Sequence, residues 1–280
     1  MKKFIVCIAT VLFCVSAAAQ AKLETKKFKI ADFQDCITKV VLTGNDMADA
    51  FLRKEVVERW TISPFEFCSQ EEFESLKTSP TTYFLMYVAG QYGHEIAPGI
   101  EFLTLVKGGA EAVDGISAMT EVVSIPSGPS GPDGREVNFL PALLDIIQNY
   151  TLKAIEKELA SFAGLGLYNR NLSATGIKRI YMANEDISFR VKDADREKYI
   201  DEDIVVTDED DVDEVIVKGT YNTLVSFVVA PLEPTAGSVC HKMLIGADDH
   251  KLYYTAKHKI TGKTGVGFLT SDLKKIAKPR

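Results

Sequence analysis

Cysteine, histidine and tryptophan are scarce in this chain of 280 residues, which holds five, four and one of them. Cys7 and Cys14 fall in an N-terminal segment that we expect to be removed, so Cys36, Cys68 and Cys240 remain. Three cysteines allow at most one internal disulfide, which excludes a scaffold built on disulfides. Cys36–Cys68 is the candidate pair because both lie in the first half; three small buried hydrophobic residues are the alternative.

The few histidines give little support for a metal site. None belongs to an HExxH motif or to another close pair that would present two imidazoles to zinc. We therefore expect ordinary surface histidines, with no metal site and no cofactor-binding site. The four are His94, His241, His250 and His258.

Long apolar runs are missing as well, apart from one at the N-terminus. Lys2 and Lys3 precede an apolar run at residues 4–15, and small residues follow it. The run is shorter than the ~20 residues that span a bilayer, so it predicts a secretory signal peptide rather than a membrane anchor. We place the signal peptide at residues 1–19, with cleavage between Ala19 and Gln20, and expect no transmembrane segment in the mature chain.

Positive charge is in the minority, with 32 Lys and Arg against 39 Asp and Glu and a net charge of −7. Removal of Lys2 and Lys3 leaves 30 against 39, or −9. An acidic protein repels phosphate backbones, so nucleic acid is not expected as a partner. The signal peptide predicts a periplasmic or secreted protein, with association with the outer membrane as a further alternative.

A stretch rich in proline and glycine stands near the middle of the chain. Residues 126–134 read Pro-Ser-Gly-Pro-Ser-Gly-Pro-Asp-Gly, a composition that interrupts helices and sheets. It predicts a linker at 126–136 between a first α/β unit at 22–125 and a second at 137–280.

Alternating and helical hydrophobic patterns predict mixed structure in the first unit. An amphipathic helix is expected at 46–60, with Asn45 as its N-cap and Met47 on its buried face. Ser69 and Glu72 form a capping-box pattern that opens a short helix. Strands are expected at 27–33, 39–42, 65–68, 82–88, 100–106 and 120–125.

The second unit is predicted to begin with a long helix at Leu140-Pro141 that ends at Gly164. A charged segment at 193–214 follows as an acidic insertion, and a short helix at 271–276 closes the chain. Strands are expected at 178–182, 215–217, 224–229, 242–245 and 251–255, with a hairpin turn at 246–249.

The two halves share an order of elements that indicates an internal repeat. Residues 67–73 match residues 181–187 in character at each position, as aromatic, soft apolar, small, amide, acid, acid and apolar. Each copy precedes an aromatic-rich or apolar strand and then another apolar strand. The predicted fold is therefore α/β (α+β), made of two similar small units, each a mixed sheet with one or two amphipathic helices.

Motifs that carry chemistry are weak or broken. The acidic run at 201–214 offers carboxylates to calcium but lacks the central glycine of an EF-hand, which favours a solvated loop. Residues 262–264, Gly-Lys-Thr, lack the earlier glycine of a phosphate-binding loop. Cys240 and His241 are neighbours in a strand and point to opposite faces, so they cannot pair. No catalytic residue can be named.

The C-terminal region is basic, which contrasts with the acidic run. Its basic residues include Lys251, Lys257, Lys259, Lys263 and Lys274. The asymmetry could dock a partner or fold one segment against the other, and we favour the second interpretation.

In each half the order of helix, strand, acid-started turn and strands resembles the envelope α/β domains of the curli-channel assembly family and the TolB amino-terminal domain. The residues that carry the resemblance are 31–33, Gly44, 65–72, 215–219 and 243–253. The acylated cysteine of the curli family has no counterpart here. The resemblance implies a non-catalytic envelope adaptor with no active-site residues to carry over.

These observations predict an exported bacterial envelope protein that acts as a non-enzymatic binding or scaffold module. Its partner would be an envelope protein or a small ligand. Two alternatives stay open: a periplasmic hydrolase with carboxylates in a cleft between the units, and a calcium-dependent surface module at residues 201–214.

Overall fold

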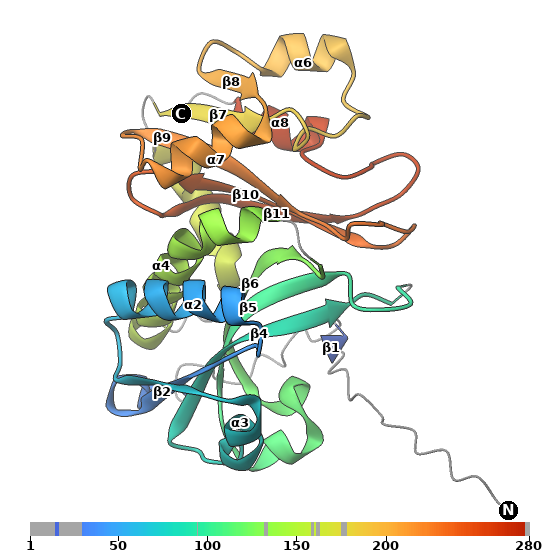
Figure 1. Ribbon diagram of the computed structural model, residues 1–280. Helices are drawn as coiled ribbons and strands as arrows, with labels where there is room; N and C mark the ends of the chain where they lie inside the picture. The colour runs from blue at the N-terminus through green and yellow to red at the C-terminus, as the bar shows by residue number, and fades with distance from the viewer. Residues whose placement is uncertain are drawn as a thin grey trace, which may run out of the picture.

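The computed structural model describes residues 15–16, 30–93, 95–131, 134–157, 160, 163–174 and 178–277. The signal peptide expected at residues 1–19 and its cleavage site at Ala19 and Gln20 lie outside the described residues, except for the short strand β1 (Val15–Ser16). Two mixed sheets with helices against them make up the molecule, as Figure 1 shows, and this confirms the α/β class.

The first unit alternates helices with strands and then adds two antiparallel strands. After the turn η1 (Phe33–Asp35) its elements are β2 (Ile37–Val41), α2 (Asp46–Arg59), β3 (Phe65–Cys68), α3 (Gln70–Leu76), β4 (Thr82–Gln91), β5 (Ile100–Lys107), η2 (Ala110–Asp114), η3 (Ile116–Ala118), β6 (Thr120–Pro129) and α4 (Arg135–Glu156). Its sheet has the order β3-β2-β4-β5-β6, and β1 pairs in parallel with Gly90 and Gln91 of β4.

The second unit repeats this plan. Its elements are η4 (Gly164–Ala174), β7 (Arg179–Ala183), α6 (Asp193–Tyr199), β8 (Ile204–Thr207), α7 (Glu209–Val217), β9 (Thr223–Val229), β10 (Val239–Gly246), β11 (Leu252–Lys259) and α8 (Thr270–Ile276). Its sheet has the order β8-β7-β9-β10-β11. In both sheets the first three strands are parallel and the last two pairings are antiparallel.

The repeat is therefore confirmed, but the sequence match paired the wrong elements. Residues 67–73 end β3 and form α3, so their structural counterpart is 206–212, which ends β8 and starts α7. Ser69 caps α3 through the amide of Glu72, and Asp208 caps α7 through the amide of Asp211. The match with 181–187 paired β3 with β7, which is the counterpart of β2.

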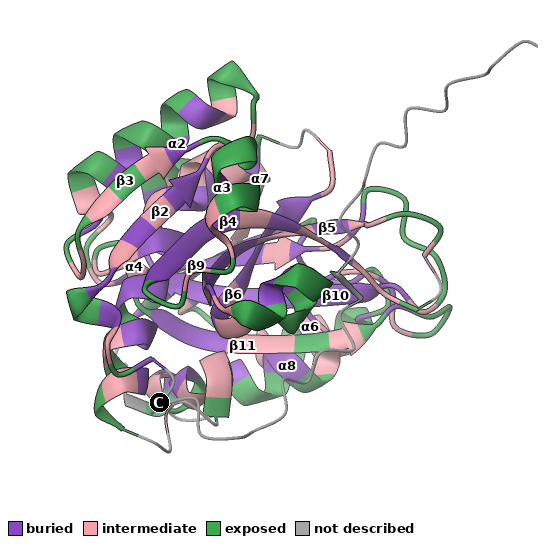
Figure 2. Cartoon of the chain, turned by 90° about the horizontal axis from the view of Figure 1, so that it is seen from below, coloured by how far each residue is buried: buried purple, intermediate pink, exposed green. Residues whose placement is uncertain are grey.

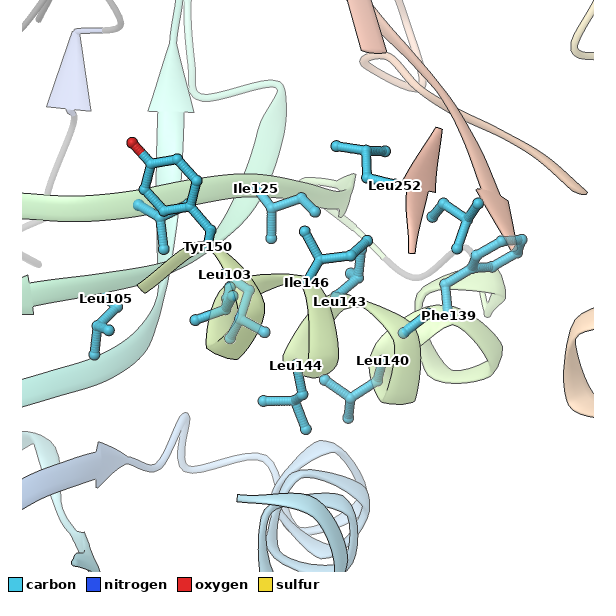
Figure 3. Packing of buried hydrophobic residues seen from close by; sticks show 14 of the residues in the cluster. Leu103, Leu105, Ile125, Phe139, Leu140, Leu143, Leu144, Ile146, Tyr150 and Leu252 are labelled. Atoms are coloured by element: carbon cyan, nitrogen blue, oxygen red, sulfur yellow. The ribbon is translucent and has the colours of Figure 1, made fainter. Parts of the chain in front are cut away.

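Helices of both units lie in the core that the two sheets share. α2 and α4 lie between the sheets, α7 packs against α4 and the second sheet, α3 covers the far side of the first sheet, and α6 and α8 cover the far side of the second (Figure 1). In Figure 3, Leu140 and Leu144 of α4 point toward α2, while Leu143 and Ile146 lie on the opposite side. One buried apolar cluster contains α4 and both sheets, so the two units share a core.

Local signals account well for the starts of α2 and α3. The Asn45 side chain accepts hydrogen bonds from the amides of Met47 and Ala48, and α3 has the complete capping box. The buried face of α2 is narrower than expected, because Met47 is 73% exposed whereas Leu52 and Val56 are fully buried. Figure 2 shows the same contrast, with exposed residues on the outer sides of α2 and α3 and buried ones on the strands.

The predicted linker is largely a strand, which corrects the boundary at 126–136. β6 continues to Pro129, and Pro126 pairs with Phe102 of β5. Proline is tolerated there because β6 is an edge strand, where a missing N–H breaks no second ladder. α4 begins at Arg135 rather than at Leu140, so Pro141 lies within the helix.

Three other expectations were wrong in local detail. Residues 30–33, the described part of the strand expected at 27–33, form a turn that leads into η1. Residues 215–217 end α7 instead of forming a strand, because Asp208 starts a helix that buries Val212 and Ile216. The long helix ends at Glu156 and not at Gly164.

The cysteine pair is a further correction. Cys36, Cys68 and Cys240 are buried free thiols. Cys36 belongs to the core shared by the two units, whereas Cys68 belongs to the cluster on the other face of the first sheet. The candidate disulfide would have to pass through the sheet, and the alternative of small buried residues holds.

Within the described part of the chain, none of the helices combines the length and apolar character needed to cross a membrane.

Candidate functional site

The acidic insertion expected at 193–214 is built into the fold instead of lying in solvent. It contains α6, β8 and most of α7. Glu209 and Asp213 of α7 form ion pairs with Arg135, and Glu214 pairs with Lys218. These three carboxylates of the acidic run therefore meet cations outside the basic C-terminal segment, whereas from the sequence we favoured folding of the run against that segment. The contact between the two regions comes from α6, which packs against α8 and whose Asp195 accepts from Thr270.

Arg135 is the centre of a buried ionic cluster at the start of α4. Its guanidinium lies 3.2 Å from Asp186 and 3.0 Å from Asp213, and it also donates to the carbonyl of Ser226. Burial acts to lower the pKa of Arg135, but the surrounding carboxylates raise it overall. Burial raises the pKa of Asp186, and Arg135 only partly offsets this.

The role of this cluster is structural, because the guanidinium of Arg135 and the surrounding carboxylates form ion pairs and hydrogen bonds with one another. The guanidinium also lies 5.5 Å from the centroid of Phe139, whose ring stacks on Phe227 at 4.1 Å. It joins the first residue of α4 to β9 and α7 of the second unit. Sequence reasoning missed it; the signal was a lone cation directly after the Pro/Gly stretch.

A second buried ion pair joins α8 to the face of the second sheet that lies away from the first unit. Lys242 of β10 donates to Asp272 of α8, which also accepts from Tyr254 and from the amide of Leu269. Burial alone would raise the pKa of Asp272, but these hydrogen bonds hold it below its ordinary value. The three hydrogen bonds of this carboxylate hold α8 against the sheet.

The histidines differ from the surface residues that we expected. His94 lies outside the described residues. His241 is 9% exposed, and its Nε2 lies 2.8 Å from the hydroxyl of Tyr92. Burial lowers the pKa of His241 to about 3, so the ring is neutral and Tyr92 donates. His250 contacts Asp145, and Nε2 of His258 contacts the carbonyl of Gly265.

Over the described ranges, no group of three or more His, Cys, Asp and Glu side chains is arranged to hold a metal ion. Residues 262–264 lie in the loop after β11, where Thr261 accepts from the amides of Lys263 and Thr264. Cys240 accepts from the amide of Gly267 while His241 contacts Tyr92, so these neighbours face different surroundings.

Loops from both units gather at one end of the molecule. They are the β4–β5 hairpin (92–93 and 95–99), the loop after β7 (187–190), the β9–β10 loop (230–238) and the loop after β11 (260–267), and we call this surface the loop face. Figure 1 shows the β4–β5, β9–β10 and β11–α8 loops projecting on the same side. A Cβ at Gly99 would lie 2.6 Å from Pro231, so the hairpin and the β9–β10 loop touch.

Exposed apolar side chains stand on three of these loops. Ile96 is 100% exposed, Phe189 71% and Leu232 58%. A second exposed set, Met47, Phe51 and Val57, follows the helix α2. Single exposed apolar residues are ordinary, but several on adjoining loops beside a pocket indicate a binding surface.

A pocket of about 260 Å³ opens on the loop face. It lies between the loops that follow β7, β9 and β11, at the carboxyl ends of these strands. Its lining consists of Phe189, Arg190, Pro234, Thr235, Ala236, Ile260, Thr261, Gly262, Gly265 and Val266. Sequence reasoning named none of these as a site, since they come from three distant segments.

Comparison of the chain with protein-family models, with curated proteins and with solved structures finds no match. The resemblance of each half to the curli-channel assembly family and the TolB amino-terminal domain therefore stays a prediction.

Proposed function

We propose that this chain is an exported, non-enzymatic binding or scaffold module of a bacterial cell envelope, and that it engages its partner through the loop face. The signal-peptide pattern at residues 1–19 supports export. The observation that carries the binding role is the exposure of Ile96, Phe189 and Leu232 on loops that both units contribute to the loop face, where Phe189 also lines a pocket.

The shared core supports a scaffold in preference to a cleft enzyme. Apolar side chains of α4, including Leu143 and Ile146, fill space between the two sheets. Asp186 and Asp213, which lie against the start of α4, are paired with Arg135. Loops on a packed support are suited to recognition, because the support holds the binding residues in position.

The calcium alternative has lost its local support. Asp208 caps α7, Asp211 accepts from Thr207, and Glu209 and Asp213 pair with Arg135. Carboxylates that already hold donors would have to release them to coordinate an ion.

Site-specific photo-crosslinking in cells of the producing organism tests the proposal. A photoreactive phenylalanine analogue replaces Ile96 or Leu232, and Tyr221 serves as the control because it is 85% exposed and precedes β9 at the opposite end of the second sheet. We expect the two loop-face positions to crosslink to the same envelope component and position 221 not to. Equal labelling at all three positions, or none at 96 and 232, would contradict the proposal.

A further inference from the structure

The pocket of the loop face has an apolar lining. Phe189, Pro234, Ala236, Ile260 and Val266 contribute apolar side chains to it. At about 260 Å³ it is smaller than the roughly 300–1,000 Å³ of pockets that hold drug-sized ligands. The space therefore suits one small flat group and not an extended cofactor.

The backbone that carries the exposed ring of Phe189 is anchored to the loop after β11 and to the residue that follows this loop. The Ser188 hydroxyl donates to the carbonyl of Thr264 at 2.6 Å, and Ile187 pairs with Phe268. A Cβ at Gly265 would lie 2.7 Å from the ring of Phe189, so the loop backbone touches the ring closely. Phe189 is thus 71% exposed on a backbone anchored to the neighbouring loop, and a ring placed in this way loses less freedom on binding than one on an unsupported loop.

Arg190 adds a positive charge to the apolar lining. Its guanidinium carbon lies 4.4 Å from the centroid of Phe189. The guanidinium of Arg190 stacks on the ring of Phe189. Among the residues that the structure describes, no carboxylate lies within ion-pair distance of this guanidinium. Arg190 therefore places a positive charge beside the apolar lining of the pocket.

We infer that this pocket binds a small organic anion, a carboxylate joined to an aromatic or similarly flat apolar group. The flat group would lie against Phe189, and the planar guanidinium of Arg190 would pair with the carboxylate through two parallel hydrogen bonds. The inference deepens the proposed function, on which it rests, by giving the loop face a ligand class. A free aromatic acid and a peptide that ends in phenylalanine share this chemistry.

Titration by NMR with four probes tests the inference and separates the two sources. Phenylacetate and acetyl-Ala-Ala-Phe carry the carboxylate, and their primary amides serve as neutral counterparts of the same shape. We expect the carboxylates to bind at least about tenfold more tightly than the amides, as a charge-assisted hydrogen bond requires. Shift changes should centre on Phe189, Thr235 and Val266.

Three variants assign the effect to its residues. Arg190→Gln should remove the preference for the carboxylate and leave amide binding unchanged, whereas Phe189→Ser should weaken both. Lys263→Gln is the matched control, because Lys263 is a cation in the neighbouring loop after β11 that does not line the pocket. All three positions are exposed, so unchanged melting temperatures should show that folding is intact.

A preference for the peptide pair identifies a protein C-terminus as the source, and equal preference identifies a free acid. The inference fails if acid and amide bind equally, if Arg190→Gln keeps the preference, or if no probe shifts the pocket resonances. Crosslinking at Ile96 and Leu232 does not use the pocket residues. Crosslinks without probe binding would therefore refute this ligand class and leave the proposed function standing.

Discussion

Arg135 and Asp186 meet in the interior of the second unit although 51 residues separate them in the chain; Nη1 of Arg135 lies 3.2 Å from Oδ1 of Asp186. Asp186 is 2% exposed and also accepts from the Ser226 hydroxyl. Removing the cation would leave a buried carboxylate without its counter-charge, and such a loss typically costs about 3–5 kcal/mol.

We therefore expect Arg135→Met to lower the free energy of unfolding by roughly this amount in urea denaturation. Lys218→Met is the matched control, because the pair of Lys218 with Glu214 is exposed and should contribute less than about 1 kcal/mol. A second test is the double variant with Asp186→Asn, which should be less destabilised than the sum of its single changes. Additive effects would show that the two side chains do not interact.

His241 predicts a specific dependence of stability on pH. Its pKa falls from an ordinary 6.5 to about 3, because burial disfavours the charged ring. A depressed pKa contributes stability that is present above pH 6.5 and is lost as the pH falls toward 3. Between pH 7 and 5 the loss should be on the order of 2 kcal/mol.

The check is urea denaturation of wild type and His241→Gln at pH 7 and pH 5. Gln cannot titrate but can accept from Tyr92, so this part of the pH dependence should disappear in the variant. Other titrating groups are common to both proteins and cancel in the difference. The same loss of stability in wild type and variant would contradict the burial of a neutral His241.

The shared core predicts that both units unfold together. The chain has a single tryptophan, Trp60, which is buried in the first unit, so its fluorescence reports that unit while far-UV circular dichroism reports the whole chain. We expect coincident midpoints in urea. Leu144→Ala should move both midpoints together and cost about 2–5 kcal/mol, whereas Met47→Ala on the exposed side of α2 should cost less than about 0.5 kcal/mol. Separate transitions would refute a common core.

Gly267 is a second point where backbone geometry is decisive. Its φ of 98° is unfavourable for other residues, and a Cβ there would lie 2.4 Å from the carbonyl oxygen of Asp186. Gly267→Ala should lower the melting temperature and cost about 1–3 kcal/mol. Gly262→Ala, in the same loop with no neighbouring atom within 4 Å, should be close to neutral. Similar effects of both substitutions would contradict the close approach at Gly267.

Features that depend on a few neighbouring residues could be read from the sequence. Asn45 and Ser69 cap their helices as expected, and the apolar runs at 82–88, 100–106 and 224–229 lie in strands. The repeat was visible only as an order of elements. Its residue match failed because aromatic and acidic positions recur at several strand ends.

The candidate site could not be read in the same way. The pocket residues come from segments around 189, 235 and 262, and no short motif joins them. The only local signals were the glycines of the loop after β11 and the aromatic residue beside a cation at Phe189 and Arg190. Neither signal indicates which loop, distant in the sequence, forms the other wall of the pocket.

By itself the sequence determined the class of fold, the starts of α2 and α3, most strand positions and the acidic charge of the chain, because caps and hydrophobic periodicity act within a few residues. Tertiary structure decided that Pro126 and Pro129 belong to an edge strand, that α4 fills the space between two sheets, and that Arg135 neutralises acids of the second unit. The physical reason is that burial and charge pairing are settled between segments far apart in the chain, where local patterns carry no information.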